Sequence, residues 1–101
     1  MKVIAISEFR SDVADGIDQA TFLREAGNVV DDLHKRGILQ SLYLRKDRPG
    51  TVVILECGTS DDAHQYMKAF PGVAAGVTTY ELVVLGSEVP PEALINARIA
   101  T

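Results

Sequence analysis

The stretch from Thr51 to Val73, TVVILECGTSDDAHQYMKAFPGV, constrains the fold of this chain more than any other. It begins with a run of β-branched and apolar residues that predicts a strand over residues 51–57. The VVIL run has no alternation of polar and apolar residues, which is typical of a strand buried on both faces. A helix cap follows at Thr59 or Ser60, and Pro71-Gly72 ends an amphipathic helix. The stretch therefore predicts a buried strand followed by a helix that packs on it.

Other strands and helices are predicted on both sides of this unit. Apolar, β-branched runs predict strands over 2–10, 38–45 and 78–85. Apolar residues at three- and four-residue spacing predict a helix from about Asp18 or Thr21 to Arg36, with Gly37 as its C-cap. The connecting segments rich in turn formers or small residues are SDVADGID, KDRPG and VAAGV, and PPEALINARIA predicts a short C-terminal helix.

The resulting order is β-α-β-β-α-β with a tail helix, within a single domain over 1–101 that has 86–101 as a C-terminal extension. This order predicts the ferredoxin-like α+β fold, a four-stranded antiparallel sheet with both helices on one face. The second face of strands 51–57 and 78–85 is also apolar, so a second copy of the sheet is expected to cover it. We therefore expect a homodimer whose sheets pack face to face.

Composition excludes several classes of protein. The net charge of -4 is spread along the chain and gives no basic face for a nucleic acid, and no apolar run approaches the roughly 18 residues of a membrane span. The start, MKVIAISEF, predicts a strand and not a signal peptide. Cys57 is the single cysteine, so it forms no internal disulfide and is expected to be a small core residue. A cytoplasmic location is the expectation.

Three segments, LHKRGILQSLYLRKD, VVILECGTSDDAH and KAFPGV, resemble the muconolactone isomerase family of the dimeric α/β-barrel superfamily. The resemblance spans roughly residues 23–85. It implies a small-molecule pocket inside the barrel or at its mouth, and a proton-shifting isomerisation of a lactone or small carboxylic acid. It also implies oligomers that can be larger than a dimer.

A second resemblance concerns FPGVAAGVTTYELVVL, which is similar to the closing segment of the YCII-like proteins of the same superfamily. Those proteins carry a histidine early in the first helix and an aspartate just before the proline of this segment. Ala26 and Phe70 stand at these positions here, so the dyad is absent. A YCII-type mechanism is not expected.

The strand over 38–45 offers candidate ligand-binding residues. Ser41, Tyr43 and Arg45 share one face because side chains alternate along a strand. One interpretation is that they lie at a sheet edge and meet solvent. The other is that they line a wet pocket, in which Arg45 binds a substrate carboxylate and Tyr43 orients it.

Three glutamates, Glu8, Glu56 and Glu81, lie within or at the ends of apolar strands. A carboxylate in such a place can act as a general acid or base, although strand-end glutamates are usually solvated. Glu81 is the preferred catalytic residue, since it matches a glutamate of the isomerase pattern, and Glu56 is assigned to substrate binding.

His64 is the second catalytic candidate, because imidazole titrates near neutrality and the isomerase pattern also has a histidine there. The alternative is a partly exposed histidine on a helix surface. His34 is expected to be a core or interface residue. The two histidines are too few to predict a metal site, and no cofactor or nucleotide motif is present.

The leading interpretation is a small-molecule enzyme with a pocket between sheet and helices, in which Arg45 and Tyr43 bind an acid and Glu81 or His64 moves a proton. A non-catalytic ligand-binding or assembly module of the same fold is the first alternative. A cofactor-free monooxygenase of the same superfamily is the second, and it requires a larger apolar cavity with a histidine pointing into it. The fold alone does not choose among these functions.

Overall fold

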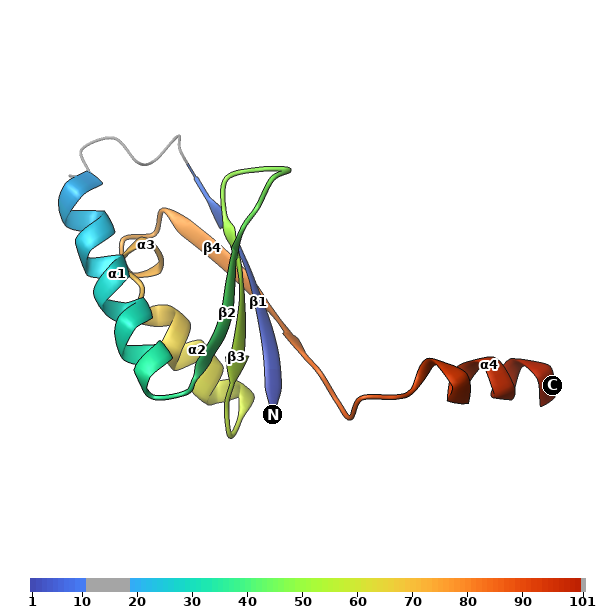
Figure 1. Cartoon of the computed structure of the whole chain (residues 1–101). Helices are drawn as coiled ribbons and strands as arrows, with labels where there is room; N and C mark the ends of the chain where they lie inside the picture. The colour runs from blue at the N-terminus through green and yellow to red at the C-terminus, as the bar shows by residue number, and fades with distance from the viewer. Residues whose placement is uncertain (11–18, 101) are drawn as a thin grey trace.

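The computed structural model describes residues 1–10 and 19–100 (Figure 1), so the loop predicted over 11–18 lies outside the described residues. Eight elements follow one another along the chain: β1 (Lys2–Phe9), α1 (Gln19–Lys35), β2 (Leu39–Leu44), β3 (Thr51–Glu56), α2 (Ser60–Lys68), α3 (Pro71–Ala74), β4 (Thr78–Val84) and α4 (Pro91–Ala100). The strands form one antiparallel four-stranded sheet in the order β2-β3-β1-β4. The helices α1, α2 and α3 lie on one side of this sheet. The predicted ferredoxin-like fold is confirmed.

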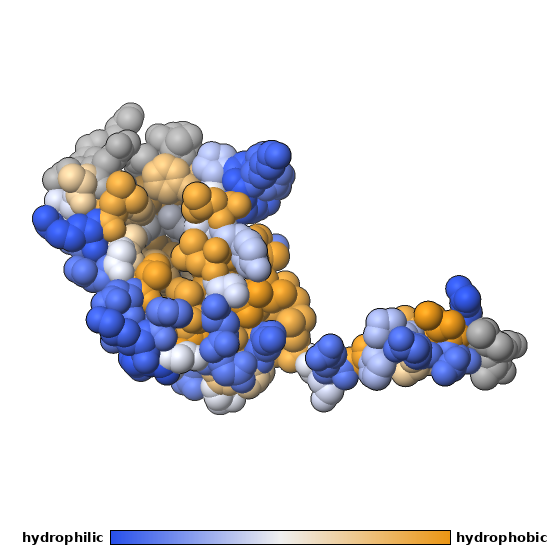
Figure 2. All heavy atoms as spheres, in the orientation of Figure 1, coloured by the Kyte–Doolittle hydropathy of each residue, from blue (hydrophilic) through white to orange (hydrophobic). Residues whose placement is uncertain are grey.

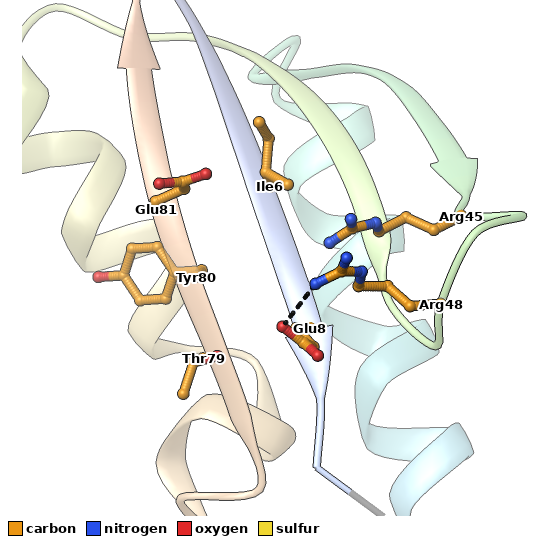
Figure 3. Close-up of a pocket in the computed structure, with 7 residues that line it drawn as sticks. All are labelled: Ile6, Glu8, Arg45, Arg48, Thr79, Tyr80 and Glu81. Carbon is orange, nitrogen blue, oxygen red and sulfur yellow. Dashed lines mark ion pairs between the residues drawn. The ribbon is translucent and has the colours of Figure 1, made fainter.

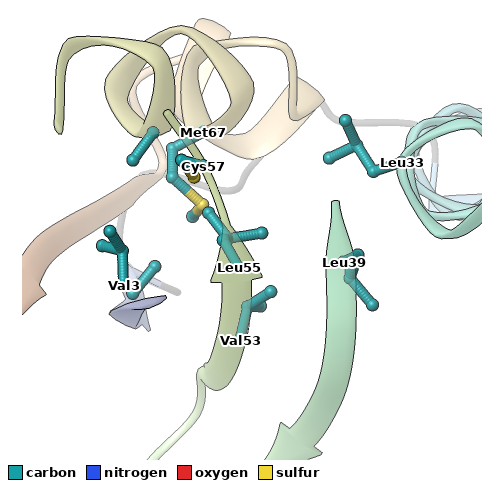
Figure 4. Close-up of a cluster of buried hydrophobic side chains, with 9 residues drawn as sticks. Val3, Leu33, Leu39, Val53, Leu55, Cys57 and Met67 are labelled. Atoms are coloured by element: carbon teal, nitrogen blue, oxygen red, sulfur yellow. The ribbon is translucent and has the colours of Figure 1, made fainter. Parts of the chain in front are cut away.

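The alternation of side chains along the central strand β1 divides the molecule into two sides. Val3, Ala5 and Ser7 are buried beneath the helices, whereas Ile4 and Ile6 point to the other side and are only half-buried. We call the side without α1, α2 and α3 the open face. On the helix side the buried apolar core consists of Val3, Ala5, Leu33, Leu39, Val53, Leu55, Cys57, Ala63 and Met67 (Figure 4).

Cys57 is buried in this core, as expected, and burial is the main cause that raises the pKa of its thiol. His34 does not lie in the core, because its side chain is exposed at the end of α1 in the single chain, and the expected alternative of an interface position stays a prediction. Its Nδ1 atom lies 3.3 Å from the Leu39 carbonyl oxygen. The last turn of α1 thus holds this side chain beside the first residue of β2 and outside the core.

A β-bulge divides β2. Leu39 pairs with Leu55 on the helix side, whereas Ser41 pairs with Ile54 on the open face, so Gln40 is the extra residue between them. Tyr43 follows on the open face opposite Val52. The alternation that was expected for Ser41, Tyr43 and Arg45 therefore begins after the bulge.

The segment after α2 contains a helical turn that the sequence did not predict. Thr59 caps α2 by accepting a hydrogen bond from the Asp62 backbone N–H at 3.1 Å, and Pro71 prevents the helix from continuing. Pro71 then begins the one-turn helix α3 in place of the expected link, because its fixed φ suits the first helical position. Gly72 lies in this turn with Thr78 and the Phe22 ring directly against it, leaving no room for a β-carbon.

The C-terminal segment leaves the sheet at β4 and ends in α4, which lies apart from the rest of the molecule in Figure 1. Within the described residues, no helix combines the length and the apolar character that crossing a membrane requires.

We predict that Leu55→Ala lowers the free energy of unfolding by about 2–5 kcal/mol, since Leu55 is fully buried and its loss leaves a cavity. Urea unfolding followed by circular dichroism measures this change. Leu23→Ala is the matched control on exposed α1 surface, where a change within about 0.5 kcal/mol is expected. Equal losses in the two variants would contradict the core described above.

Candidate functional site

Apolar side chains from three adjacent strands meet on the open face. Ile4 lies between Ile54 of β3 and Val83 of β4, and Ile6 pairs with Val52. These side chains are half-buried or exposed within the single chain. Apolar residues also gather along the side of the body nearest α4 in Figure 2.

A polar notch interrupts this apolar surface at the end of the sheet where the β2–β3 hairpin lies. Its volume is about 320 Å³, and its lining consists of Ile6, Glu8, Arg45, Arg48, Thr79, Tyr80 and Glu81 (Figure 3). Strands β1 and β4 supply the two glutamates, which are diagonal neighbours, because Glu8 pairs with Thr79 and Ile6 pairs with Glu81. The hairpin supplies both arginines.

Gly50 allows the hairpin to approach β1 closely. Its φ of +154 is uncommon for other residues, and a β-carbon there would collide with the Ser7 carbonyl group. The Gly50 carbonyl accepts a hydrogen bond of 2.9 Å from the Arg45 backbone N–H, and the Pro49 carbonyl accepts one of 3.0 Å from Phe9. The turn residues between β2 and β3 are thus tied to β1, and both arginines are held at the notch.

Arg45 is bound within the hairpin. Its Nε and Nη2 atoms donate hydrogen bonds of 3.1 and 2.9 Å to the Asp47 carboxylate, and Nη1 donates one of 3.3 Å to the Ser7 carbonyl. Only 16% of its side chain is exposed. The hydrogen bond with Asp47 is the largest cause that raises the pKa of Arg45 and lowers the pKa of Asp47. This arginine therefore fixes the shape of the turn.

Arg48 is the freer cation of the notch and was missed by sequence analysis. Its Nη1 atom lies 3.6 Å from Glu8 Oε2 and its Nε atom 3.5 Å from Asp47 Oδ2, with 54% of the side chain exposed. The KDRPG segment did contain a signal, because a tight turn at Pro49-Gly50 folds nearby side chains back toward the sheet. Sequence analysis used that segment only as a turn.

The structure brings Arg45 and Glu81 into one notch, but it separates the other candidate residues. Ser41 and the exposed Tyr43 are on the open face outside the notch lining. Glu56 is at the opposite end of the sheet, where its Oε1 atom accepts a hydrogen bond of 2.8 Å from the N-terminal ammonium group. This contact is the largest cause that lowers the pKa of Glu56.

His64 lies on the helix side of the sheet. Its Nδ1 atom is 2.8 Å from the Tyr80 hydroxyl oxygen, and both side chains border the space between α2 and β4. Tyr80 and Glu81 are consecutive in β4 and therefore point to opposite faces. The sheet thus stands between His64 and the Glu81 carboxylate.

A second hollow lies between the sheet and the helices α1 and α3. Its volume is about 250 Å³, and its lining consists of Ser7, Phe9, Phe22, Ala26, Leu44, Gly50, Thr51, Phe70, Pro71, Gly72 and Thr78. We call it the aromatic pocket. Its polar groups are hydroxyls, and Ser7 Oγ lies 2.8 Å from Thr51 Oγ1. Ala26 and Phe70, which replace the YCII-type dyad, both line it.

Among residues 1–10 and 19–100, no group of His, Cys, Asp and Glu side chains is arranged to hold a metal ion. The guanidinium and carboxylate groups of the notch can bind an anion and can accept or donate a proton.

We predict that Arg45→Gln raises the pKa of Asp47 toward the ordinary aspartate value, because the guanidinium that stabilises the carboxylate is lost. Because the pKa of Asp47 is lower in the folded chain than in the unfolded chain, its ionised carboxylate stabilises the folded state at any pH above the ordinary aspartate pKa. This stabilisation is lost as the pH falls through the lowered pKa of the folded chain. NMR titration of the Asp47 carboxyl carbon measures this pKa in the natural chain and in Arg45→Gln. Lys35→Gln, which removes the separate pair with Asp31, should leave Asp47 unchanged. An unaltered Asp47 midpoint in Arg45→Gln would contradict this account.

Comparison with known proteins identifies the fold. No family model matches the chain, and no curated protein matches it. Among solved structures it is similar to 5-chloro-2-hydroxyhydroquinone dehydrochlorinase from Burkholderia phenoliruptrix AC1100 in complex with 2,5-dihydroxybenzoquinone, with 14% identity and a TM-score of 0.62 over 87% of this chain and 96% of that chain. It is also similar to an antibiotic biosynthesis monooxygenase, with 14% identity and a TM-score of 0.49 over 85% of this chain and 98% of that chain. The first of these likenesses shows a shared ferredoxin-like fold.

Proposed function

We propose that this protein is a small-molecule enzyme that moves a proton on a lactone or small carboxylic acid bound in the polar notch. One observation carries the proposal: two arginines and two glutamates line a single notch whose floor includes the apolar side chain of Ile6. Arginine binds carboxylates well, and carboxylates serve as general bases. The resemblance of the sequence to muconolactone isomerases supports the same reaction class.

The surroundings of each residue suggest its role. Arg45 is held by Asp47 and the Ser7 carbonyl, so in this proposal it positions the hairpin. Arg48 is more exposed and binds the carboxylate of the substrate. Glu8 is the weaker candidate for the base, because its carboxylate faces Arg48, and Glu81 on β4 takes the part of the base.

The proposed reaction is an isomerisation in which no atom is gained or lost. The Glu81 carboxylate removes a proton from the carbon next to the lactone carbonyl, and negative charge develops on the carbonyl oxygen. The positive charge of Arg48, which binds the substrate carboxylate, also stabilises the additional negative charge that develops on this enolate. Glu81 then returns the proton to a different carbon of the conjugated system. His64 takes no part in this scheme, because it lies on the other side of the sheet.

The notch opens on the uncovered face of the sheet, so we propose that a second copy closes it. Two open faces that each carry Ile4, Ile6, Val52, Ile54 and Val83 would bury these side chains against one another. Closure would exclude water from the notch and strengthen the interactions of charged groups inside it. The homodimer is thus part of the proposed function. The proposal also includes a cytoplasmic location and a reaction that uses no cofactor.

For the notch we predict that Arg48→Gln weakens the binding of a carboxylate-bearing unsaturated lactone by about tenfold, the effect of losing one charge-assisted hydrogen bond. Isothermal titration calorimetry measures the affinity. Glu81→Gln should bind with nearly unchanged affinity but should slow the exchange of the lactone proton with deuterium by about 10²- to 10⁴-fold. Proton NMR follows this exchange.

Lys46→Gln is the matched control, since it removes an exposed cation from the same hairpin outside the notch lining. Both binding and exchange are expected to remain unchanged in it. The notch proposal fails if Arg48→Gln and Lys46→Gln bind equally well, or if Glu81→Gln exchanges the proton at the unaltered rate.

The aromatic pocket supports a second candidate function, the binding of a flat hydroxylated ring. Phe9, Phe22 and Phe70 provide apolar walls, and the hydroxyls of Ser7, Thr51 and Thr78 can orient polar groups of a ligand. The similar dehydrochlorinase structure contains 2,5-dihydroxybenzoquinone. None of the described residues of the lining is a histidine, and the monooxygenase alternative requires one, so we favour a binding module for this pocket.

For the aromatic pocket we predict that 2,5-dihydroxybenzoquinone binds the natural chain and that Ala26→Leu reduces its affinity at least tenfold, because the larger side chain fills the pocket. Ala69→Leu, on the exposed end of α2, is the control of equal size change. Titration followed by ¹⁵N NMR gives both the affinity and the residues perturbed. Binding that survives Ala26→Leu would exclude this pocket.

A further inference from the structure

The C-terminal segment gives the chain a shape that a compact monomer would not have. The radius of gyration is 16.6 Å, whereas about 13 Å is expected for a compact domain of this length. The accessible surface is 6963 Å², compared with about 5,600 Å² for a typical monomer of this mass. The excess is larger than the roughly 800 Å² that each partner buries in a standard stable interface.

Part of this excess is apolar surface on the segment that follows β4. Leu94 is 73% exposed and Ile95 is 47% exposed, and both line a hollow whose described lining residues belong to α4. Val89, just before Pro90-Pro91, is exposed as well. A helix as short as α4 is marginal in water without packing, so its apolar side chains need a surface to cover them. We call residues 86–98 the C-terminal arm.

The arm projects away from its own body on the side of the open face (Figure 1). It leaves from β4, one edge of the sheet, while the most exposed apolar side chain of the body, Leu44, lies on β2, the other edge. Leu44 is 80% exposed and Leu42 is 41% exposed. Both lie on the helix side of this edge, because Leu42 pairs with the core residue Val53 and Leu44 pairs with Thr51. The C-terminal arm of the same chain points away from the β2 edge.

A second copy brings the two exposed surfaces together. When open faces meet about a two-fold axis parallel to the strands, β4 of one copy lies over β2 of the other. The geometry points to an exchanged arm: the arm of each copy passes the β2 edge of the other, and the Leu94–Ile95 side of α4 packs on Leu42 and Leu44 on the helix side of that edge. The exchange would also cover an exposed edge strand, which is otherwise open to unwanted pairing.

Sedimentation velocity on the full chain tests whether α4 stabilises a dimer. The natural chain is expected to be a dimer or a larger even-numbered assembly. The double variant Leu94→Ser with Ile95→Ser should raise the dissociation constant at least tenfold, while Glu92→Ser on the same helix should leave it unchanged. A monomeric natural chain, or a double variant that associates as tightly as the natural chain, would overturn the inference.

Disulfide trapping tests where the arm lies. A Leu94→Cys chain is mixed with a mass-tagged Leu44→Cys chain and oxidised, and a disulfide-linked adduct of the two chains is expected. Asp61→Cys, on α2 over β1 and β4 and away from the β2 edge, replaces Leu44→Cys as the control and should give no more adduct than the natural chain, in which Cys57 is buried. Equal yields with both partners would overturn the assignment to β2.

The inference uses the open-face dimer of the proposed function but not its chemistry. A Leu94→Ser, Ile95→Ser chain that keeps the dimer and binds lactone normally would refute the exchanged arm alone. Loss of lactone binding in Arg48→Gln with normal trapping between positions 94 and 44 would support the notch and the arm independently.

Discussion

The pairing of β1 on both of its edges is the constraint on which the rest of this structure depends. Because β1 lies between β3 and β4, each of its residues points either into the helix-covered core or onto the open face. The first set stabilises the monomer by burial. The second set, with Ile4 and Ile6 at its centre, leaves an apolar surface that the notch beside Glu8 and Glu81 interrupts. Stability and candidate chemistry are thus placed on opposite sides of the same strand.

Much of the fold could be predicted from the sequence because its signals are local. The unbroken apolar run in β3, the Thr59 cap and the stop at Pro71 each specify backbone structure within a few residues. The sequence was less informative where one residue serves two elements. Pro71 ends α2 because it has no backbone N–H and disfavours the helical conformation at Phe70, and it begins α3 because its fixed φ suits the first helical position. Only the three-dimensional path of the chain shows the second use.

The candidate site could be predicted only in part, because its residues come from strands that are distant in the sequence. Alternation correctly gave the face of Arg45, but it could not show that Asp47 occupies this guanidinium and leaves Arg48 freer. It also could not place His64 relative to Glu81, since this depends on which face of the sheet α2 covers. The Glu56 contact with the N-terminus joins two segments whose proximity arises from the pairing of β1 with β3.

The bulge in β2 has a consequence for changes in chain length. Gln40 is the residue that the ladder skips, so its deletion would let Leu39 and Ser41 keep their partners Leu55 and Ile54 on opposite faces. Deletion of a residue between Ser41 and Arg45 would instead exchange the faces of the side chains on one side of the gap. Deletion of Gln40 would therefore leave Ser41 and Tyr43 on the open face. Deletion of a residue between Ser41 and Arg45 would not.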